Sequence, residues 1–357
     1  HAARTPEAAG MTAHPRGRAL HGGRASIRDV AARAGVSVTT VSHALNGTRF
    51  VSQQALAKVH EAAQALGYVP SEVARGLKHN TTRTLGMLVP NNSNPYFAEI
   101  IRGVEHHSYA AGFSLLLCNS NDDPQQQADH LRVLAERRVD GIVLVASGDD
   151  DAIVAACKDL RLPLVLVDRE IDTIAVDLIE VDHAAGAELA TSHLLSLGHP
   201  RVACIVGPAD LRPSQQREAG WRRALEHAGV TPRADEVVHA DFGPQGGAAA
   251  MRRLLQSPQP PTAVFVCNDM MAIGALHAAH EAGIDVPRQL SVVGFDDIEL
   301  AAYTSPPLTT VAQPKEAIGA GAAGLLLERL REGRTAPRRA ILPAQLHLRS
   351  STARRAS

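Results

Sequence analysis

The sequence predicts a protein of two parts, an N-terminal all-α helix-turn-helix domain followed by an α/β core of two doubly wound lobes. The first observation is that residues 26–47 form two short helical patterns on either side of a glycine. The second is that short apolar runs alternate with helical patterns from Thr84 onward, as in parallel sheets covered on both faces. The alternation continues for about 265 residues, which is long for one sheet, so we expect two similar lobes and a cleft.

The segment SIRDVAARAGVSVTTVSHALNG has the spacing of a helix-turn-helix motif. Gly35 supplies a turn position that tolerates positive φ, and the Ser37 hydroxyl can cap the second helix. An ordinary helical hairpin has the same spacing, so the pattern alone leaves both interpretations open. A third helix is expected over residues 53–66. The apolar positions of the two motif helices are Ile27, Val30, Ala31, Ala34, Val41, Ala44 and Leu45, and the outward positions are Val38, Thr39, Ser42 and His43.

Eight apolar runs predict the strands of the core, and amphipathic segments between them predict its helices. Polar residues such as Asp168 and Asn268 end several runs. Ligands bind at the carboxyl ends of strands in such sheets, so the cleft is expected to hold a polar ligand. The runs are 84–90, 113–119, 141–146, 162–168, 201–207, 236–241, 262–268 and 291–296, and the helices are 96–112, 125–138, 183–197, 214–228, 244–256, 269–282 and 314–332.

Charge and composition narrow the class of protein. Residues 1–83 carry 11 Lys and Arg against 4 Asp and Glu, whereas the rest of the chain carries an excess of acidic residues. A basic end on an acidic body fits a nucleic-acid-binding module attached to another domain. No run of 18 apolar residues, metal-ligand spacing, nucleophile elbow or phosphate-binding loop is found, so we expect no membrane span, no metal, no cofactor and no enzyme activity. The scattered cysteines, which indicate free thiols in a cytoplasmic protein, are Cys118, Cys157, Cys204 and Cys267.

The expected domain boundaries follow these patterns. Residues 1–25 lack a signal-peptide pattern and are expected to form a disordered leader. The helix-turn-helix domain follows over 26–70, and a hinge helix with its linker over 71–83. The core is expected over 84–350, with the chain crossing between lobes near 182–184 and 312–314, and with a tail at 351–357.

The chain resembles the LacI/GalR family of bacterial transcription repressors over about residues 26–350. The resemblance rests on the motifs VSVTTVSHALNGTRFVS and GYVPSEVARGLK. His43 and residues 48–50 are most similar to the branch of the purine and ribose repressors, with ribose operon repressors closest in pattern. The resemblance implies a core like a periplasmic ribose-type binding protein, and a cytoplasmic homodimer that binds double-stranded operator DNA.

The resemblance also implies the DNA contacts. The residues matching Thr39 and His43 reach base edges, and the residue matching Arg49 adds a base contact. Val38 presents a methyl surface that could face thymine. In the hinge helix at 71–80, the resemblance assigns Leu77 as a wedge in the minor groove and Lys78 beside it. Such a short helix, which contains a glycine, is expected to fold only on DNA. The residues expected to hold phosphates or cap the helix are Ser37, Thr40 and Ser42.

For the effector site, the resemblance implies a sugar held between aromatic rings and ringed by hydrogen-bonding groups. Asp168 and Arg169 match an acidic–basic pair that grips ring hydroxyls. Purine-responsive relatives usually lack this pair and carry an aromatic residue at the position of Arg169, which disfavours a purine. Close ribose repressors can also carry Trp there, so Arg169 indicates a sugar, and the agreement of the whole set of residues favours ribose. The expected effector-binding residues are Asn94, Tyr96, Phe97, Asp168, Arg169, Arg217, Phe242, Asn268, Asp296 and Gln313.

Several alternatives remain at this point. Phe97 could belong to the core, Asp296 could hold its own loop, and Arg217 could form a surface ion pair. The effector could be a purine or another sugar, and the effector pocket could have lost its ligand. A periplasmic sugar-binding protein without a regulatory role would lack the DNA-binding module. Ribose acting as an inducer that releases DNA is the expectation.

Overall fold

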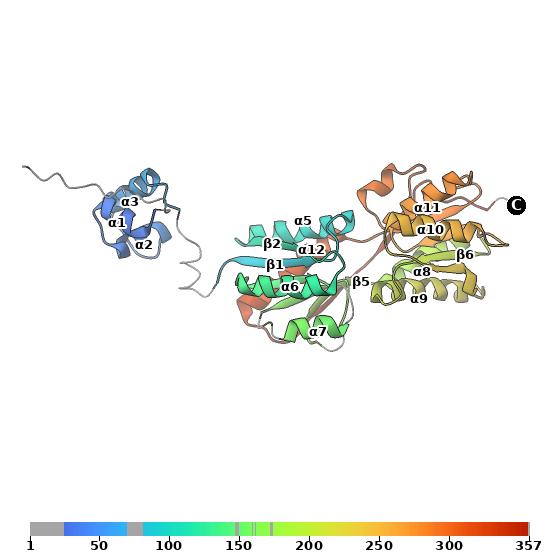
Figure 1. Ribbon diagram of the computed structural model, residues 1–357, viewed down its shortest axis with the longest axis horizontal. Helices are drawn as coiled ribbons and strands as arrows, with labels where there is room; N and C mark the ends of the chain where they lie inside the picture. The colour runs from blue at the N-terminus through green and yellow to red at the C-terminus, as the bar shows by residue number, and fades with distance from the viewer. Residues whose placement is uncertain are drawn as a thin grey trace, which may run out of the picture. The chain divides into compact units, whose positions relative to one another are not determined.

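The structure is a computed structural model that describes residues 25–69, 81–146, 150–158, 160, 162–171 and 174–355. The chain divides into two compact units, His1–His79 and Asn80–Ser357 (Figure 1). The first unit is helical in its described part, and the second contains two α/β lobes. The hinge-helix positions Leu77 and Lys78 lie outside the described residues.

The helical unit consists, in its described part, of α1 (Ile27–Ala34), α2 (Val38–Asn46) and α3 (Gln53–Ala65). Serines begin these helices: Ser26, Ser37 and Ser52 each accept a hydrogen bond from a backbone N–H of the first turn. Gly35 has a φ of 65°, the left-handed conformation that ends α1 and turns the chain into α2. The small core contains Val30, Val41 and Val59, each fully buried, together with alanines that let the helices approach closely.

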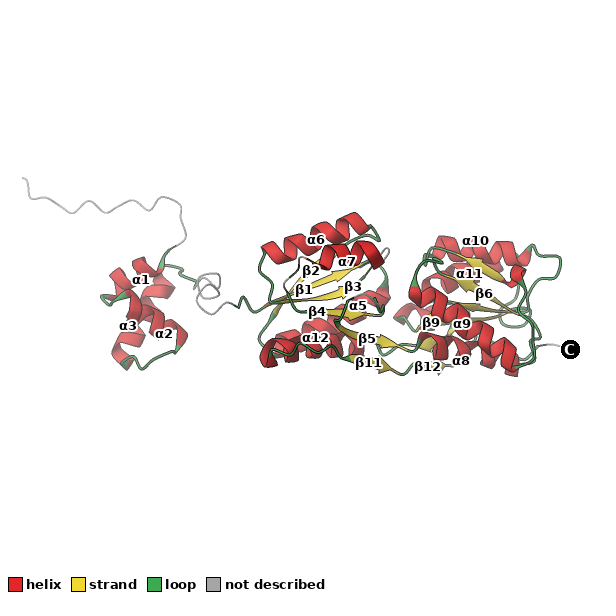
Figure 2. Cartoon of the chain, turned by 90° about the horizontal axis from the view of Figure 1, so that it is seen from below, coloured by secondary structure: helices red, strands yellow, loops and turns green. Residues whose placement is uncertain are grey.

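Lobe 1 of the second unit contains a six-stranded parallel sheet in the order β11-β5-β4-β3-β1-β2. Helices α6 and α7 cover one face, and α5 and α12 cover the other (Figure 2). The strands are β1 (Thr84–Val89), β2 (Ser114–Asn119), β3 (Gly141–Val145), β4 (Leu164–Val167), β5 (Asp177–Val181) and β11 (Arg339–Leu342), and the helices are α5 (Pro95–Ala110), α6 (Pro124–Glu136), α7 (Asp150–Lys158) and α12 (Lys315–Glu332).

Lobe 2 repeats this plan with the strand order β12-β10-β9-β8-β6-β7, in which β12 runs antiparallel to β10. Helices α8 and α9 pack together on one face, and α10 and α11 on the other (Figure 2). The strands are β6 (Val202–Val206), β7 (Val237–His239), β8 (Ala263–Val266), β9 (Ser291–Asp296), β10 (Thr309–Ala312) and β12 (Gln345–His347), and the helices are α8 (His183–Ser196), α9 (Arg212–His227), α10 (Pro244–Leu255) and α11 (Asp269–Glu281).

Within the described residues, three passages connect the lobes. Asp182 joins β5 to α8, residues 313–314 join β10 to α12, and residues 343–344 join β11 to β12. The third passage was not predicted, because its strands have only four and three residues and alternate between exposed and half-buried positions, which leaves no long apolar run. Three passages restrict relative motion of the lobes to rotation about the segments that connect them.

Two further features differ from the sequence expectation. Strand β5 was not predicted, because Asp177 and Glu180 interrupt its apolar pattern; both are buried, Asp177 in ion pairs with Arg329 and Arg334 at 3.0 and 2.8 Å. The expected tail after residue 350 is wrong for its described part. Ser351 is fully buried, where its Oγ accepts a hydrogen bond from the backbone N–H of Thr309, so the core continues beyond residue 350.

Candidate functional site

Helix α2 presents the residues that were expected to contact DNA. Val38 and Thr39 are exposed in the first turn, and Ser42 and His43 are half-buried one turn later. Ser37 begins the helix, where its hydroxyl accepts a hydrogen bond from the Thr40 backbone N–H at 3.0 Å. The side chains are short and the helix is capped, so α2 offers a narrow surface of the kind that fits a major groove.

The loop after α2 also bears on this surface. His43 Nδ1 lies 2.7 Å from the Thr48 hydroxyl, which fixes the direction of the ring. Arg49 is exposed beside Phe50, whose side chain is 96% exposed. The described DNA-contact candidates therefore lie together on α2 and its following loop, and Phe50 is an exposed aromatic residue that the expected contacts did not include.

A cavity of about 770 Å³ lies between the two lobes of the second unit, at the carboxyl ends of their strands. All of the expected effector residues line it except Gln313. A smaller cavity of about 280 Å³ lies beside β4, β5 and β11, away from the expected residues. The larger volume is within the range of sites that hold small organic ligands.

Three aromatic side chains line the cavity. Tyr96 and Phe97 lie in the first turn of α5 and pack edge to face with their ring centroids 5.1 Å apart. Asn94 caps this helix by accepting a hydrogen bond from the Tyr96 backbone N–H at 3.0 Å. Phe242 comes from lobe 2, where its backbone oxygen accepts a hydrogen bond from the Asn268 side chain at 3.0 Å. Rings from both lobes can therefore contact the C–H faces of one ligand.

Glycine at position 207 makes room for Phe242. A Cβ atom at this position would lie 2.2 Å from the ring of Phe242. Phe242 itself has a φ of 64°, and Asp168 and Asp296 also have positive φ values, of 66° and 114°. Such conformations are unfavourable for residues with side chains, and they gather where a surrounding structure holds them for binding.

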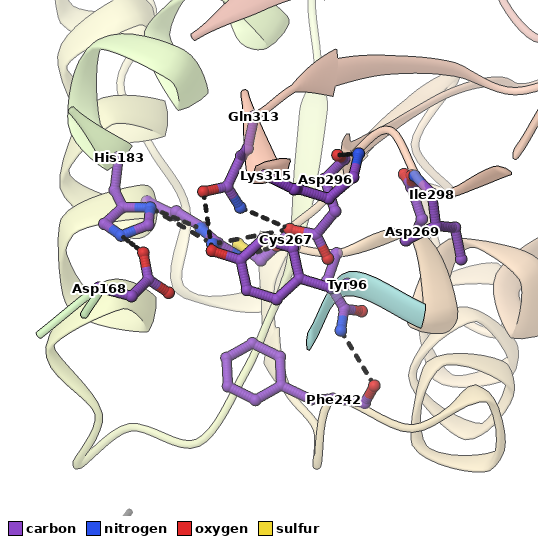
Figure 3. Close-up of polar contacts among 12 residues, drawn as sticks. Tyr96, Asp168, His183, Phe242, Cys267, Asp269, Asp296, Ile298, Gln313 and Lys315 are labelled. Carbon is purple, nitrogen blue, oxygen red and sulfur yellow. Dashed lines mark hydrogen bonds and ion pairs between the residues drawn. The ribbon is translucent and has the colours of Figure 1, made fainter. Parts of the chain in front are cut away.

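A buried polar chain links Asp168, His183 and Arg217. His183 Nε2 lies 2.8 Å from Asp168 Oδ1, and His183 Nδ1 lies 3.3 Å from both Nε and Nη2 of Arg217 (Figure 3). Burial raises the pKa of Asp168, but His183 and Arg217 oppose this effect and leave the pKa below its ordinary value. Asp168 is therefore a carboxylate that can accept hydrogen bonds from a ligand.

A second buried group surrounds Asp296. Gln313 donates to Asp296 Oδ1 at 2.8 Å and accepts from the Tyr96 hydroxyl at 3.1 Å. Lys315 Nζ donates to the backbone oxygen of Asp296 at 2.8 Å. Burial raises the pKa of Asp296 to about 6, although Arg217 lowers it. Gln313 therefore holds Tyr96 and Asp296 in place. It was expected to bind the effector, but it does not line the cavity.

Several residues of this site were not predicted from the sequence. His183 belongs to the buried polar group of Asp168, and Lys315 belongs to the buried polar group of Asp296. They were missed because a single histidine or lysine at the start of a helix gives no distinctive sequence signal. Asp122, Asp210 and Asp241 also line the cavity. They lie in loops after strands, and the rule that ligands bind at strand ends could have identified them.

The structure also bears on metal binding and on membrane insertion. Within the described ranges, no group of three or more His, Cys, Asp or Glu residues is arranged to hold a metal ion. In the same part of the chain, every helix is too short or too polar to cross a membrane.

Two family models match the chain. Residues 26–71 match the bacterial regulatory proteins of the lacI family, and residues 191–352 match the periplasmic binding protein-like domain. The HTH-type transcriptional repressor PurR of Aliivibrio salmonicida is 42% identical over 309 residues, covering 86% of this chain and 93% of the relative. The ribose operon repressor of Escherichia coli K12 is also 42% identical, over 307 residues, with 86% and 93% coverage.

Solved structures agree with this similarity. The lac repressor dimer bound to operator and the anti-inducer ONPF has a TM-score of 0.85 at 28% identity, covering 93% of this chain and 100% of that chain. A LacI family transcriptional regulator from Enterococcus faecium with bound ribose has a TM-score of 0.68 at 33% identity, covering 76% and 99%. The relatives are regulators and not enzymes. The chain belongs to the LacI family and is a DNA-binding transcriptional repressor.

Proposed function

We propose that the effector of this repressor is ribose, and that ribose acts as an inducer. The observation that carries the proposal is the composition of the cavity between the lobes. It brings together three aromatic rings, two arginines, several carboxylates and four side-chain amides, all of the types that bind the faces and hydroxyls of a sugar. The ribose bound to the Enterococcus faecium regulator supports this assignment.

The charge of the cavity supports a neutral, unphosphorylated ligand. Its carboxylates outnumber its cations, and a phosphate group would meet repulsion from them. Hydroxyl groups, in contrast, donate to carboxylates and accept from guanidinium groups. The charged residues lining the cavity are Asp122, Asp168, Asp210, Asp241 and Asp296, against Arg169 and Arg217.

The purine alternative also has support, because PurR proteins are as similar to this chain as the ribose repressor is. The same aromatic rings could stack on a purine base. Against a purine, Arg169 places a charged side chain at the cavity wall and leaves less flat apolar surface for a base. We therefore treat a purine base, with hypoxanthine as the probe, as the competing effector.

We infer that the repressor acts in the cytoplasm as a homodimer on a pseudo-palindromic operator. Similarity to the lac repressor dimer on its operator supports this arrangement. In each subunit, α2 would read one half-site through Val38, Thr39 and His43, with Arg49 adding a contact. Closure of the lobes on ribose would shift the dimer away from its DNA-binding state, a coupling of about 1–3 kcal/mol in typical cases.

Isothermal titration of the purified full-length chain tests the effector, with D-ribose, D-xylose, L-arabinose, ribose 5-phosphate and hypoxanthine as ligands. We expect ribose to bind and ribose 5-phosphate to bind at least about tenfold more weakly. A gel shift on promoter DNA from neighbouring genes then tests whether ribose weakens or strengthens DNA binding. Release of operator DNA by ribose supports the proposal, whereas binding of hypoxanthine alone, or tighter DNA binding with ribose, contradicts it.

A further inference from the structure

We propose that His183 is a positioning residue of the effector cavity, which fixes the hydrogen-bonding directions of Asp168 and Arg217 before the effector binds. The proposal rests on the proposed function, because it concerns how the sugar is held. The His183 side chain is fully buried beside Asp168 (Figure 3). It is not among the residues that line the cavity.

The two neighbours of His183 determine which ring nitrogen carries the hydrogen. Every N–H group of Arg217 is a donor, so His183 Nδ1, at 3.3 Å from Nε and Nη2, must be an acceptor. The hydrogen of a neutral ring then lies on Nε2, the nitrogen that is 2.8 Å from Asp168 Oδ1. A ring protonated on both nitrogens would direct an N–H group at the guanidinium. The neutral ring with hydrogen on Nε2 therefore accepts from Arg217 and places its N–H group within 2.8 Å of Asp168 Oδ1, although the two atoms are not aligned as a hydrogen bond.

The ring of His183 lies at the start of a capped helix and beside an aromatic ring. His183 is the first residue of α8, and Asp182 caps this helix by accepting a hydrogen bond from the Ala185 backbone N–H at 2.9 Å. The ring of Phe295 lies beside it, with the two centroids 6.1 Å apart. The guanidinium carbon of Arg217 lies 4.0 Å from the centroid of the same Phe295 ring. One aromatic ring thus supports both members of the pair.

A glycine makes this support possible. A Cβ atom at position 186 would lie 2.8 Å from the ring of Phe295. Glycine at this position therefore lets the first turn of α8 approach the ring, and His183 is carried on that same turn.

The contacts of His183 with Asp168 and Arg217 matter because of where His183 lies in the fold. Asp168 follows β4 in lobe 1, whereas Arg217 belongs to α9 in lobe 2. His183 follows directly after Asp182, one of the passages between the lobes. Displacement during a rotation grows with distance from the axis, so a contact beside a passage changes little as the lobes open and close. Both polar groups would thus be oriented before the effector arrives, which lowers the cost of binding.

Three variants separate the two contacts of His183. In His183→Asn, the side-chain oxygen can replace Nδ1 as acceptor for Arg217, but no donor reaches Asp168. In His183→Gln, the amide nitrogen can replace Nε2 as donor to Asp168. His183→Ala removes both contacts. We expect the affinity for D-ribose to fall about ten- to a hundredfold in His183→Ala, and by less in the other two.

Operator binding without sugar and the melting temperature measure whether each variant folds. His193→Ala is the matched control, because His193 lies on the same helix and contacts Thr352 at 3.0 Å. We expect it to leave ribose affinity unchanged. Equal ribose affinity in wild type and His183→Ala would overturn the proposal, as would a loss of affinity that merely follows the loss of melting temperature.

Nitrogen-15 NMR of the wild-type chain tests the arrangement independently of any ligand. The spectrum of His183→Gln identifies the His183 signals by their absence. At pH 7 we expect Nε2 to carry the hydrogen and Nδ1 to be unprotonated. A hydrogen on Nδ1 would contradict the positioning role. If wild type shows this tautomer but no ribose binding, the proposed effector is wrong while the buried arrangement stands.

Discussion

The residues of α2 and the residues of the effector cavity differ in how far each side chain depends on the others. Polar contacts around α2 are local: Ser37 bonds to Thr40, and His43 to Thr48. In the cavity, contacts join residues far apart in the sequence, as between Tyr96 and Gln313 or between Arg217 and His183. The surface of α2 that we propose to read DNA is thus held by helix caps and a small core, whereas the cavity is held by contacts among its own side chains.

This difference predicts how substitutions act in the two regions. An exposed side chain such as Thr39 can be removed with little effect on folding, so its substitution measures the DNA contact. A buried side chain such as Arg217 supports its neighbours, so its substitution also changes their positions. The effects of two substitutions on DNA affinity should therefore add within α2. The effects of two substitutions on ribose affinity should fail to add within the cavity.

The largest effect is expected for Asp296→Ala. Removing this carboxylate takes away a hydroxyl acceptor and leaves Arg217, at 3.8 Å, without that partner in a buried site. We expect ribose affinity to fall at least about a hundredfold, with operator binding retained and no longer released by ribose. Titration calorimetry and gel shifts measure the two effects, and Asp285→Ala, an exposed position of lobe 2, is the control. Loss of operator binding in a folded variant would contradict the assignment.

A smaller effect is expected for Leu77→Ala in the hinge segment. If Leu77 inserts into the minor groove, its removal takes away the side chain that keeps the operator bent. Specific binding should weaken about tenfold or more, whereas binding to random duplex DNA should change little, because that depends on phosphate contacts. Fluorescence anisotropy with both duplexes at one salt concentration measures the ratio. Equal weakening on both would exclude the wedge.

The additivity of substitutions provides the next test. Thr39→Ala and His43→Ala are each expected to weaken specific binding by roughly 1 kcal/mol or more, and the double variant by about the sum. Asp168→Asn and Arg217→Lys are expected to show a coupling of about 0.5–3 kcal/mol in ribose affinity, because His183 joins them. Double-mutant cycles measure both quantities. Coupling in α2 as large as in the cavity would remove the contrast between the two regions.

The same contrast explains what the sequence could predict. Continuous apolar runs identified strands such as β1 and β8, because their burial on both faces leaves a strong pattern. Strand β5 was missed because Asp177 is buried by pairing with Arg329 and Arg334, partners more than 150 residues away. Most cavity residues were identified through a family resemblance, but His183 was not, because its role depends on contacts across the fold. Distant pairing of buried polar groups leaves no local signal.

The smallest effect we expect is a dependence of ribose affinity on pH. Burial raises the pKa of Asp296 to about 6, so this group is mostly charged at pH 7 and mostly protonated at pH 5. The charged form is the better acceptor for hydroxyl groups, and affinity should therefore fall as pH decreases, by at most about tenfold over this range. Calorimetric titrations from pH 5 to pH 8, with Asp296→Asn as the control, measure this dependence. An unchanged pH profile in that variant would assign the titration to another group.

Helix α2 and the effector cavity should also differ in the pH dependence of ligand binding. A raised pKa means that the charged carboxylate of Asp296 costs folding free energy as the pH rises, and hydroxyl donors of a bound sugar would partly offset that cost. Thr39 and its neighbours on α2 carry no such buried carboxylate. Specific DNA binding by His43→Ala at constant salt, a variant without the histidine of α2, should therefore lack a matching midpoint near pH 6. Operator titrations over the same pH range measure this, and a midpoint shared by both ligands would show that Asp296 also controls the DNA-binding state.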